Sequence, residues 1–126
     1  MSKARILYIE DNPDNMILVQ RVLMVEGYEV IEATNGIEGV ARAKEILPDI
    51  VITDINLPDI DGYEITHRLK THDTTAHIPV VAMTANVMKK DRENVEQAGC
   101  DGYISKPIDI DELPKQIEDF IKKGKV

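Results

Sequence analysis

Short apolar stretches alternate with amphipathic stretches along the whole chain. Five stretches are rich in β-branched and other apolar residues and are too short for helices; they are residues 6–9, 29–33, 50–53, 79–83 and 102–105. Each is followed by polar or turn-forming residues and then by a segment with apolar residues at helical spacing. The pattern therefore predicts five β–α units in succession.

Capping and helix-breaking residues indicate where the predicted helices begin and end. Pro13 suits the first position of the first helix, with Asp11 or Asn12 as its cap and Gly27 as its terminator. The other four predicted helices cover residues 37–47, 63–70, 86–98 and 111–122. Apolar strands joined by crossover helices are typical of a parallel sheet that is covered on both faces.

The order of these elements predicts a doubly wound α/β fold of the flavodoxin type. Right-handed crossovers favour a five-stranded sheet with the order 2-1-3-4-5 and five helices around it. No linker or low-complexity segment interrupts residues 1–126, so we expect one domain without an output domain.

Composition narrows the classes of function. No apolar run approaches the roughly 20 residues that cross a membrane, and the first residues do not resemble a signal peptide. The single cysteine, Cys100, fits a reducing compartment. A net charge of −8 with scattered basic residues argues against direct contact with nucleic acid. We therefore expect a cytoplasmic protein that binds neither membranes nor nucleic acid.

Polar side chains stand where the predicted strands end. Glu10 and Asp11 end the first strand, Asp54 the third and Thr84 the fourth, and Lys106 follows the fifth. Because parallel strands share one carboxyl edge, these groups should converge near the switch point between strands 1 and 3. Carboxylates held this close repel one another, so a cation is expected among them. Oxygen ligands with room for water favour Mg²⁺.

Nucleotide-binding loops are absent from the sequence. The first β–α turn, residues 10–14, has no glycine, and its acidic residues would repel a pyrophosphate. No Walker-type glycine-lysine loop occurs elsewhere. A dinucleotide site is therefore excluded.

The residues at the strand ends resemble the signature of response-regulator receiver domains. The shared elements are the Glu10-Asp11 pair, the stretch TDINLPDIDG at residues 53–62, Thr84-Ala85, and Tyr103-x-x-Lys106-Pro107. They occur in the order that the family has, and the resemblance covers essentially the whole chain. Any one of these elements alone would be weak support.

The resemblance implies a role for each position. Asp54 would accept a phosphoryl group, Asp11 would bind Mg²⁺ directly and Glu10 mainly through water, and the backbone carbonyl of Asn56 would be a further ligand. Lys106 would contact the transferred phosphoryl group, and its bond to the following proline is a candidate for the cis form.

The resemblance also implies a switch and its partners. Thr84 would hydrogen-bond the phosphoryl group and Tyr103 would turn inward behind it, changing the face made by helix 4, strand 5 and helix 5. The donor would be a sensor histidine kinase or a phosphotransfer protein, and a downstream protein would bind the altered face. Such a protein catalyses only its own phosphorylation and dephosphorylation, and it acts alone or as the receiver of a larger hybrid kinase.

Two alternatives come from other classes. A Mg²⁺-dependent phosphohydrolase with an aspartyl nucleophile usually needs a second acid two residues later, where this chain has Asn56. A pseudo-receiver would share the fold but never be phosphorylated, and the complete set of acidic residues with Lys106 argues against it.

Overall fold

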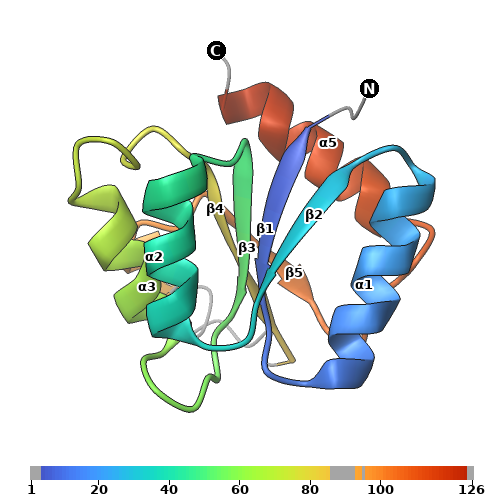
Figure 1. The fold of residues 1–126 in the computed structure, drawn as a ribbon, viewed down its shortest axis with the longest axis horizontal. Helices are drawn as coiled ribbons and strands as arrows, with labels where there is room; N and C mark the ends of the chain where they lie inside the picture. The colour runs from blue at the N-terminus through green and yellow to red at the C-terminus, as the bar shows by residue number, and fades with distance from the viewer. Residues whose placement is uncertain (1–3, 86–92, 95, 125–126) are drawn as a thin grey trace.

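A computed structural model describes residues 4–85, 93, 94 and 96–124 of the chain. Five parallel strands form one sheet with the order β2-β1-β3-β4-β5, which confirms the predicted fold class and order (Figure 1). The strands are β1 (Arg5–Ile9), β2 (Glu29–Ala33), β3 (Ile50–Asp54), β4 (Val80–Thr84) and β5 (Gly102–Ser105). Their bounds lie within one residue of the predicted ones.

Four helices flank the sheet in the described part of the chain: α1 (Pro13–Val25), α2 (Gly36–Ile46), α3 (Gly62–Lys70) and α5 (Leu113–Gly124). Most of the predicted fourth helix, residues 86–98, lies outside the described residues. Helix α5 begins two residues later than predicted. The Asp109 side chain accepts hydrogen bonds from the amides of Asp111 and Glu112, at 3.0 and 3.2 Å, and so holds a turn before the helix.

Side-chain caps start three of the helices directly after strands or short loops. The side chain of Asn12 accepts hydrogen bonds from the amides of residues 14 and 15 at the start of α1. The side chain of Asn35 accepts one from the amide of Glu38 in α2. Asp61 caps α3 in the same way. A side-chain oxygen at the cap satisfies amides that have no partner within the helix. These caps place three helix N-termini at the carboxyl edge of the sheet.

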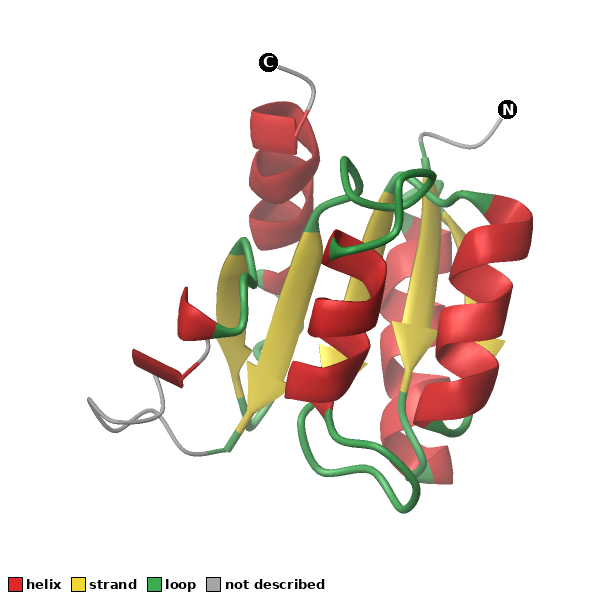
Figure 2. Cartoon of the chain, turned by 90° about the vertical axis from the view of Figure 1, so that its left-hand side faces the viewer, coloured by secondary structure: helices red, strands yellow, loops and turns green. Residues whose placement is uncertain are grey.

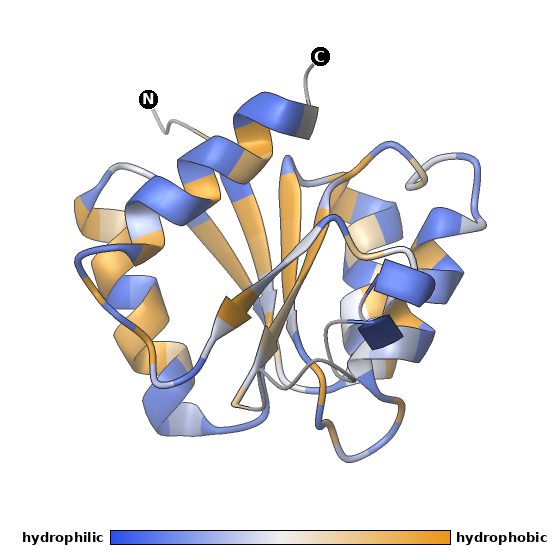
Figure 3. Cartoon of the chain, turned by 180° about the vertical axis from the view of Figure 1, so that it is seen from behind, coloured by the Kyte–Doolittle hydropathy of each residue, from blue (hydrophilic) through white to orange (hydrophobic). Residues whose placement is uncertain are grey.

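The sheet is covered by helices on both faces, with α2 and α3 on one side and α1 and α5 on the other (Figure 1). Figure 2 looks onto the sheet from the side of α2 and α3. Alternate strand residues point to opposite faces, so the chain has two main apolar layers. One layer packs α1 and α5 on the sheet through Val19, Leu23 and Ile117. The other packs α2 and α3 through Ala43 and Ile65. Apolar residues line the strands, whereas the outer helix faces are mainly polar (Figure 3).

Strand register brings the site residues to one edge. Ile9 of β1 pairs with Thr53 of β3, so the residues that follow each of them are neighbours. On the other side of β3, Asp54 pairs with Met83, and the main-chain amide of Lys106 donates to the Thr84 carbonyl at 2.8 Å. The ends of strands β1, β3, β4 and β5 therefore lie in one row.

Candidate functional site

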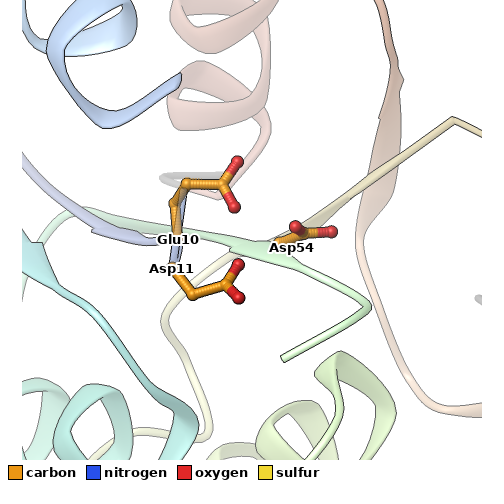
Figure 4. A group of neighbouring side chains, drawn as sticks. All are labelled: Glu10, Asp11 and Asp54. Atoms are coloured by element: carbon orange, nitrogen blue, oxygen red, sulfur yellow. The ribbon is translucent and has the colours of Figure 1, made fainter. Parts of the chain in front are cut away.

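Three carboxylates face one another at the ends of β1 and β3. One oxygen each from Glu10, Asp11 and Asp54 lies within 4.8 Å of the other two (Figure 4). Glu10 is 1% exposed and Asp54 is 7% exposed, while Asp11 is open to solvent. The predicted convergence of these residues is therefore present, and the cluster is accessible from the side of Asp11.

Lys106 bridges the two buried carboxylates from the far side of the site. Its Nζ lies 3.1 Å from Glu10 Oε1 and 3.1 Å from Asp54 Oδ2. The bond between Lys106 and Pro107 is cis, as the sequence suggested. Burial alone would lower the pKa of Lys106, but the hydrogen bonds to Asp54 and Glu10 outweigh it and raise that pKa. The ammonium group is therefore charged and held inside the cluster.

One ammonium group does not balance the three acidic side chains. Burial and the nearby Asp54 raise the pKa of Glu10, and the opposing effect of Lys106 is smaller. Glu10 Oε2 is buried and has no hydrogen-bond partner among the described residues. A buried carboxylate oxygen without a partner is costly unless a cation or water meets it.

A small divalent cation fits this cluster. The free Glu10 oxygen, the exposed Asp11 carboxylate and Asp54 offer oxygen atoms only, and the open side leaves room for water ligands. This donor set matches the preference of Mg²⁺ for a few carboxylates and several waters. The site therefore has both the ligands and the excess negative charge that Mg²⁺ requires.

Tyr8 contacts the cluster from within the core, and no motif in the sequence singles it out. The Tyr8 side chain is fully buried, and its hydroxyl donates to Glu10 Oε1 at 3.1 Å and lies 3.6 Å from Met83 Sδ. Burial and then the charge of Glu10 raise the pKa of Tyr8 far above its ordinary value. The hydroxyl keeps its proton and remains a donor. Only the two-residue spacing to Glu10, which puts both on one sheet face, hinted at this contact.

Three other predicted residues lie around the cluster. The amide of Asn56 donates to Asp54 Oδ1 at 3.3 Å, so the start of the loop after β3 lies against the Asp54 side chain. Thr84 is buried at the end of β4. Tyr103 is half-buried on β5 and packs with Ile55 and other residues beside the site. The roles predicted for the Asn56 carbonyl, Thr84 and Tyr103 stay predictions.

Family comparison agrees with this geometry. Residues 6–118 match the model of the response regulator receiver domain, and the chain belongs to this family of two-component signalling domains. It is 41% identical over 116 residues to the polar-differentiation response regulator DivK of Brucella anthropi, a match that covers 92% of this chain and 94% of that protein.

Two solved structures show the same architecture. The receiver domain of a sensor histidine kinase from Pseudomonas aeruginosa has a TM-score of 0.87 and 34% identity, and it carries a magnesium ion in its active-site cleft. That match covers 94% of this chain and 98% of the other. The chemotaxis response regulator CheY4 of Vibrio cholerae has a TM-score of 0.88 and 25% identity, covering 93% of this chain and 98% of that chain.

Receiver domains are signalling modules rather than enzymes with a separate substrate, and they bind Mg²⁺ at an acidic pocket and interact with histidine kinases and effectors. None of the helices in the described part of this chain has the length and apolar character needed to cross a bilayer.

Proposed function

We propose that Asp54 accepts a phosphoryl group from a sensor histidine kinase or a phosphotransfer protein in a Mg²⁺-dependent reaction. The observation that supports this most is the placement of the Asp54 carboxylate, which has an oxygen 3.1 Å from the Lys106 ammonium group and an oxygen within 4.8 Å of oxygens of Glu10 and Asp11. A carboxylate nucleophile needs neighbouring positive charge, because the phosphoryl group that it attacks is itself anionic.

The transfer requires one new bond and one broken bond. An Asp54 oxygen bonds to phosphorus while the bond from phosphorus to the donor's histidine nitrogen breaks, and the electron pair of that bond leaves with the imidazole. Asp54 Oδ2 already lies 3.1 Å from Lys106 Nζ. The same ammonium group is within reach of a phosphoryl oxygen once Asp54 carries the group.

Asp11 would hold the metal directly and Glu10 mainly through water, with Asp54 and the Asn56 carbonyl as further ligands. Bound Mg²⁺ supplies positive charge that offsets the charge on the transferring oxygens. Tyr8 and Lys106 both meet Glu10 Oε1, which leaves Oε2 for the metal side.

Phosphorylation would then change the protein's contacts. Thr84 lies at the end of β4, next to the strand that carries Asp54, and its hydroxyl would bond a new phosphoryl oxygen. Tyr103 would turn inward behind it, and the face around β5 and α5 would bind a downstream protein in the cytoplasm. The chain would catalyse only its own phosphorylation and dephosphorylation.

Mass spectrometry of the intact protein tests the proposal. Incubation with Mg²⁺ and acetyl phosphate, or with a phosphorylated kinase, should add one phosphoryl group to the wild type. The adduct should be labile to hydroxylamine, as an acyl phosphate is, absent from Asp54→Ala, and strongly reduced in EDTA. Absence of any adduct on the wild type would favour the pseudo-receiver, and an adduct that persists in Asp54→Ala would identify a different acceptor.

The variant Lys106→Ala distinguishes the phosphorylation of Asp54 from the conformational change that would follow it. Lys106 is not the nucleophile, so the variant should keep some phosphorylation. It should lose the conformational change, which is measured as chemical-shift changes at Thr84 and Tyr103. A variant that keeps the full response would show that the ammonium group does not couple phosphate to the switch.

A further inference from the structure

The loop after the acceptor strand, residues 55–61, is bound to the start of helix α2. Asp59 Oδ1 accepts a hydrogen bond from the Gly36 amide at 2.8 Å, and Oδ2 accepts one from the Ile37 amide at 2.7 Å. Both bonds join a carboxylate to free amides at a helix N-terminus, where the helix dipole favours negative charge. One side chain thus ties two segments that are more than 20 residues apart.

Helix α2 already has a cap of its own. The Asn35 side chain accepts the Glu38 amide at 2.8 Å, as a local N-cap does. Asp59 adds a second set of bonds to the same helix end from a different part of the chain. These bonds hold the loop against the helix as well as supplying partners to the helix amides.

Close packing reinforces the tether. A Cβ atom at Gly36 would lie 2.9 Å from the Ile60 carbonyl oxygen and 3.2 Å from Asp59 Oδ1. The first of these distances is shorter than a carbon atom tolerates, so a side chain at Gly36 would push the loop away. Glycine at this position allows the loop backbone to rest directly on the helix end.

The ends of the same loop lie against the acceptor. The Asn56 amide donates to Asp54 Oδ1, and the Gly62 amide donates to the Ile55 carbonyl at 2.9 Å. A Cβ atom at Gly62 would lie 2.9 Å from the Asp54 carbonyl oxygen, so the loop returns in direct contact with β3. Asp59 and Asn56 therefore lie on one short segment that is held at both of its ends.

We propose that Asp59 is a positioning residue that holds this loop so that the Asn56 backbone stays at the Mg²⁺ site. The inference rests on the proposed function, because it concerns the carbonyl ligand named there. The Asp59 side chain bonds the start of α2, and within the described part of the chain it makes no hydrogen bond to the acidic cluster, so it acts through the loop. Replacing a residue that holds a metal ligand in place, without binding the metal itself, typically weakens metal binding strongly.

The charge state of Asp59 agrees with a tether under physiological conditions. Slight burial raises the pKa of Asp59, but backbone hydrogen bonds together lower it by more, those from the Ile37 and Gly36 amides most, and the pKa lies below its ordinary value. The carboxylate is therefore ionised at neutral pH, and both bonds are assisted by charge.

Isothermal titration with Mg²⁺ alone tests the inference on three variants of the full chain. Asp59→Ala removes the tether, and Gly36→Ala displaces the loop without changing any charge. Asn35→Ala is the matched control, since it removes a cap from the same helix whose hydrogen bond goes to the Glu38 amide within α2 rather than to the loop. Chemical unfolding in EDTA measures how much each variant is destabilised.

We expect Asp59→Ala and Gly36→Ala to raise the Mg²⁺ dissociation constant about tenfold, the lower end for groups that orient a metal ligand. Asn35→Ala should leave it unchanged despite a loss of stability. Phosphorylation of Asp59→Ala by acetyl phosphate should need more Mg²⁺ for half its maximal rate, and should recover at saturating Mg²⁺. Asp59→Asn keeps one acceptor oxygen and should fall between the wild type and Asp59→Ala.

Other results would overturn the inference. Unchanged Mg²⁺ affinity in Asp59→Ala, or equal weakening in Asn35→Ala, would show that Asp59 only caps the helix. If Asp59→Ala does not fold, Gly36→Ala and Asp59→Asn decide the question in the same way. A wild type that binds no Mg²⁺ and takes no phosphoryl group would overturn the proposed function and this inference together, whereas failure in the variants alone would leave the proposed function intact.

Discussion

A lysine pairs with carboxylates at each end of the sheet, and the two arrangements differ in how their charges balance. At the amino end of β4, Lys70 Nζ lies 2.8 Å from Asp101 Oδ2 and 2.8 Å from the Ile78 carbonyl oxygen. Asp101 Oδ2 also accepts the amide of Val80 at 2.7 Å. One cation meets one anion there, and main-chain groups supply further partners for both.

At the carboxyl end, one lysine meets two buried carboxylates beside a third that is exposed. Lys106 reaches Glu10 and Asp54, Asp11 stands next to them, and Glu10 Oε2 has no partner within the described chain. The same residue types thus build a neutral ion pair at one edge and a negatively charged cluster with two buried carboxylates at the other. A balanced pair ties secondary structure together, and an unbalanced cluster is free to bind a cation.

The largest expected effect concerns the excess charge itself. Asp11→Ala should raise the dissociation constant for Mg²⁺ by about 100-fold, because it removes a carboxylate that binds the metal directly. Replacing a residue that only orients a metal ligand typically costs about 10-fold to 100-fold in affinity, so the loss of a direct ligand should lie at the upper end. Glu10→Ala should weaken binding less, since its predicted contact runs through water. Isothermal titration measures both, with Asp101→Ala as the unaffected control. Unchanged binding in both site variants would contradict the metal assignment.

Replacement of each lysine in turn tests the contrast in stability. Lys106→Met should lower the free energy of unfolding in EDTA by about 2 kcal/mol, within the range for hydrogen bonds to charged groups. Lys70→Met should lower it by about 1 kcal/mol, because its partner Asp101 is partly exposed and the ion pair is screened by solvent. Mg²⁺ should stabilise Lys106→Met more than it stabilises the wild type, because the cation replaces the missing positive charge. For Lys70→Met the gain should equal that of the wild type. Urea unfolding with and without Mg²⁺ measures these gains. Equal stabilisation of both variants by Mg²⁺ would show that the two lysine sites do not differ in charge balance.

A smaller effect is expected from the buried donor beneath the cluster. Tyr8→Phe removes the hydroxyl that donates to Glu10 Oε1 and leaves the ring in the core, so it should cost about 1 kcal/mol of stability in EDTA. In a Glu10→Ala background the same change should cost less, because the hydroxyl has already lost its partner. Thermal unfolding of the four proteins gives the coupling. Equal costs in both backgrounds would mean that the hydroxyl does not support Glu10.

The smallest effect concerns a carboxylate outside the cluster. The pKa of Asp59 is lowered in the folded state, so its contribution to stability is present above the unfolded pKa and disappears as pH falls through the folded pKa. The wild type should therefore be more stable than Asp59→Asn at neutral pH, and the difference should shrink on acidification. Because Asp59 is exposed, solvent screening keeps this effect small. A difference that stays constant with pH would contradict the shift.

Local patterns in the sequence were sufficient for the fold and for the members of the cluster. Short apolar runs predict strands, and parallel strands share one carboxyl edge. The acidic pair at residues 10–11, Asp54, Thr84 and Lys106 therefore had to converge, and the structure places them together. Helix ends were less accurate where side chains compete with the helix, as the turn held by Asp109 before α5 shows.

Tertiary structure alone decided which atoms meet. The sequence marks Glu10 as a candidate ligand, but only the packed sheet places Tyr8 and Lys106 on Oε1 and leaves Oε2 without a partner among the described residues. The sequence likewise contains no sign that Asp59 binds the amides of Gly36 and Ile37. Strand and helix preferences are set by neighbours along the chain, whereas these contacts depend on the distance between segments that meet only after folding.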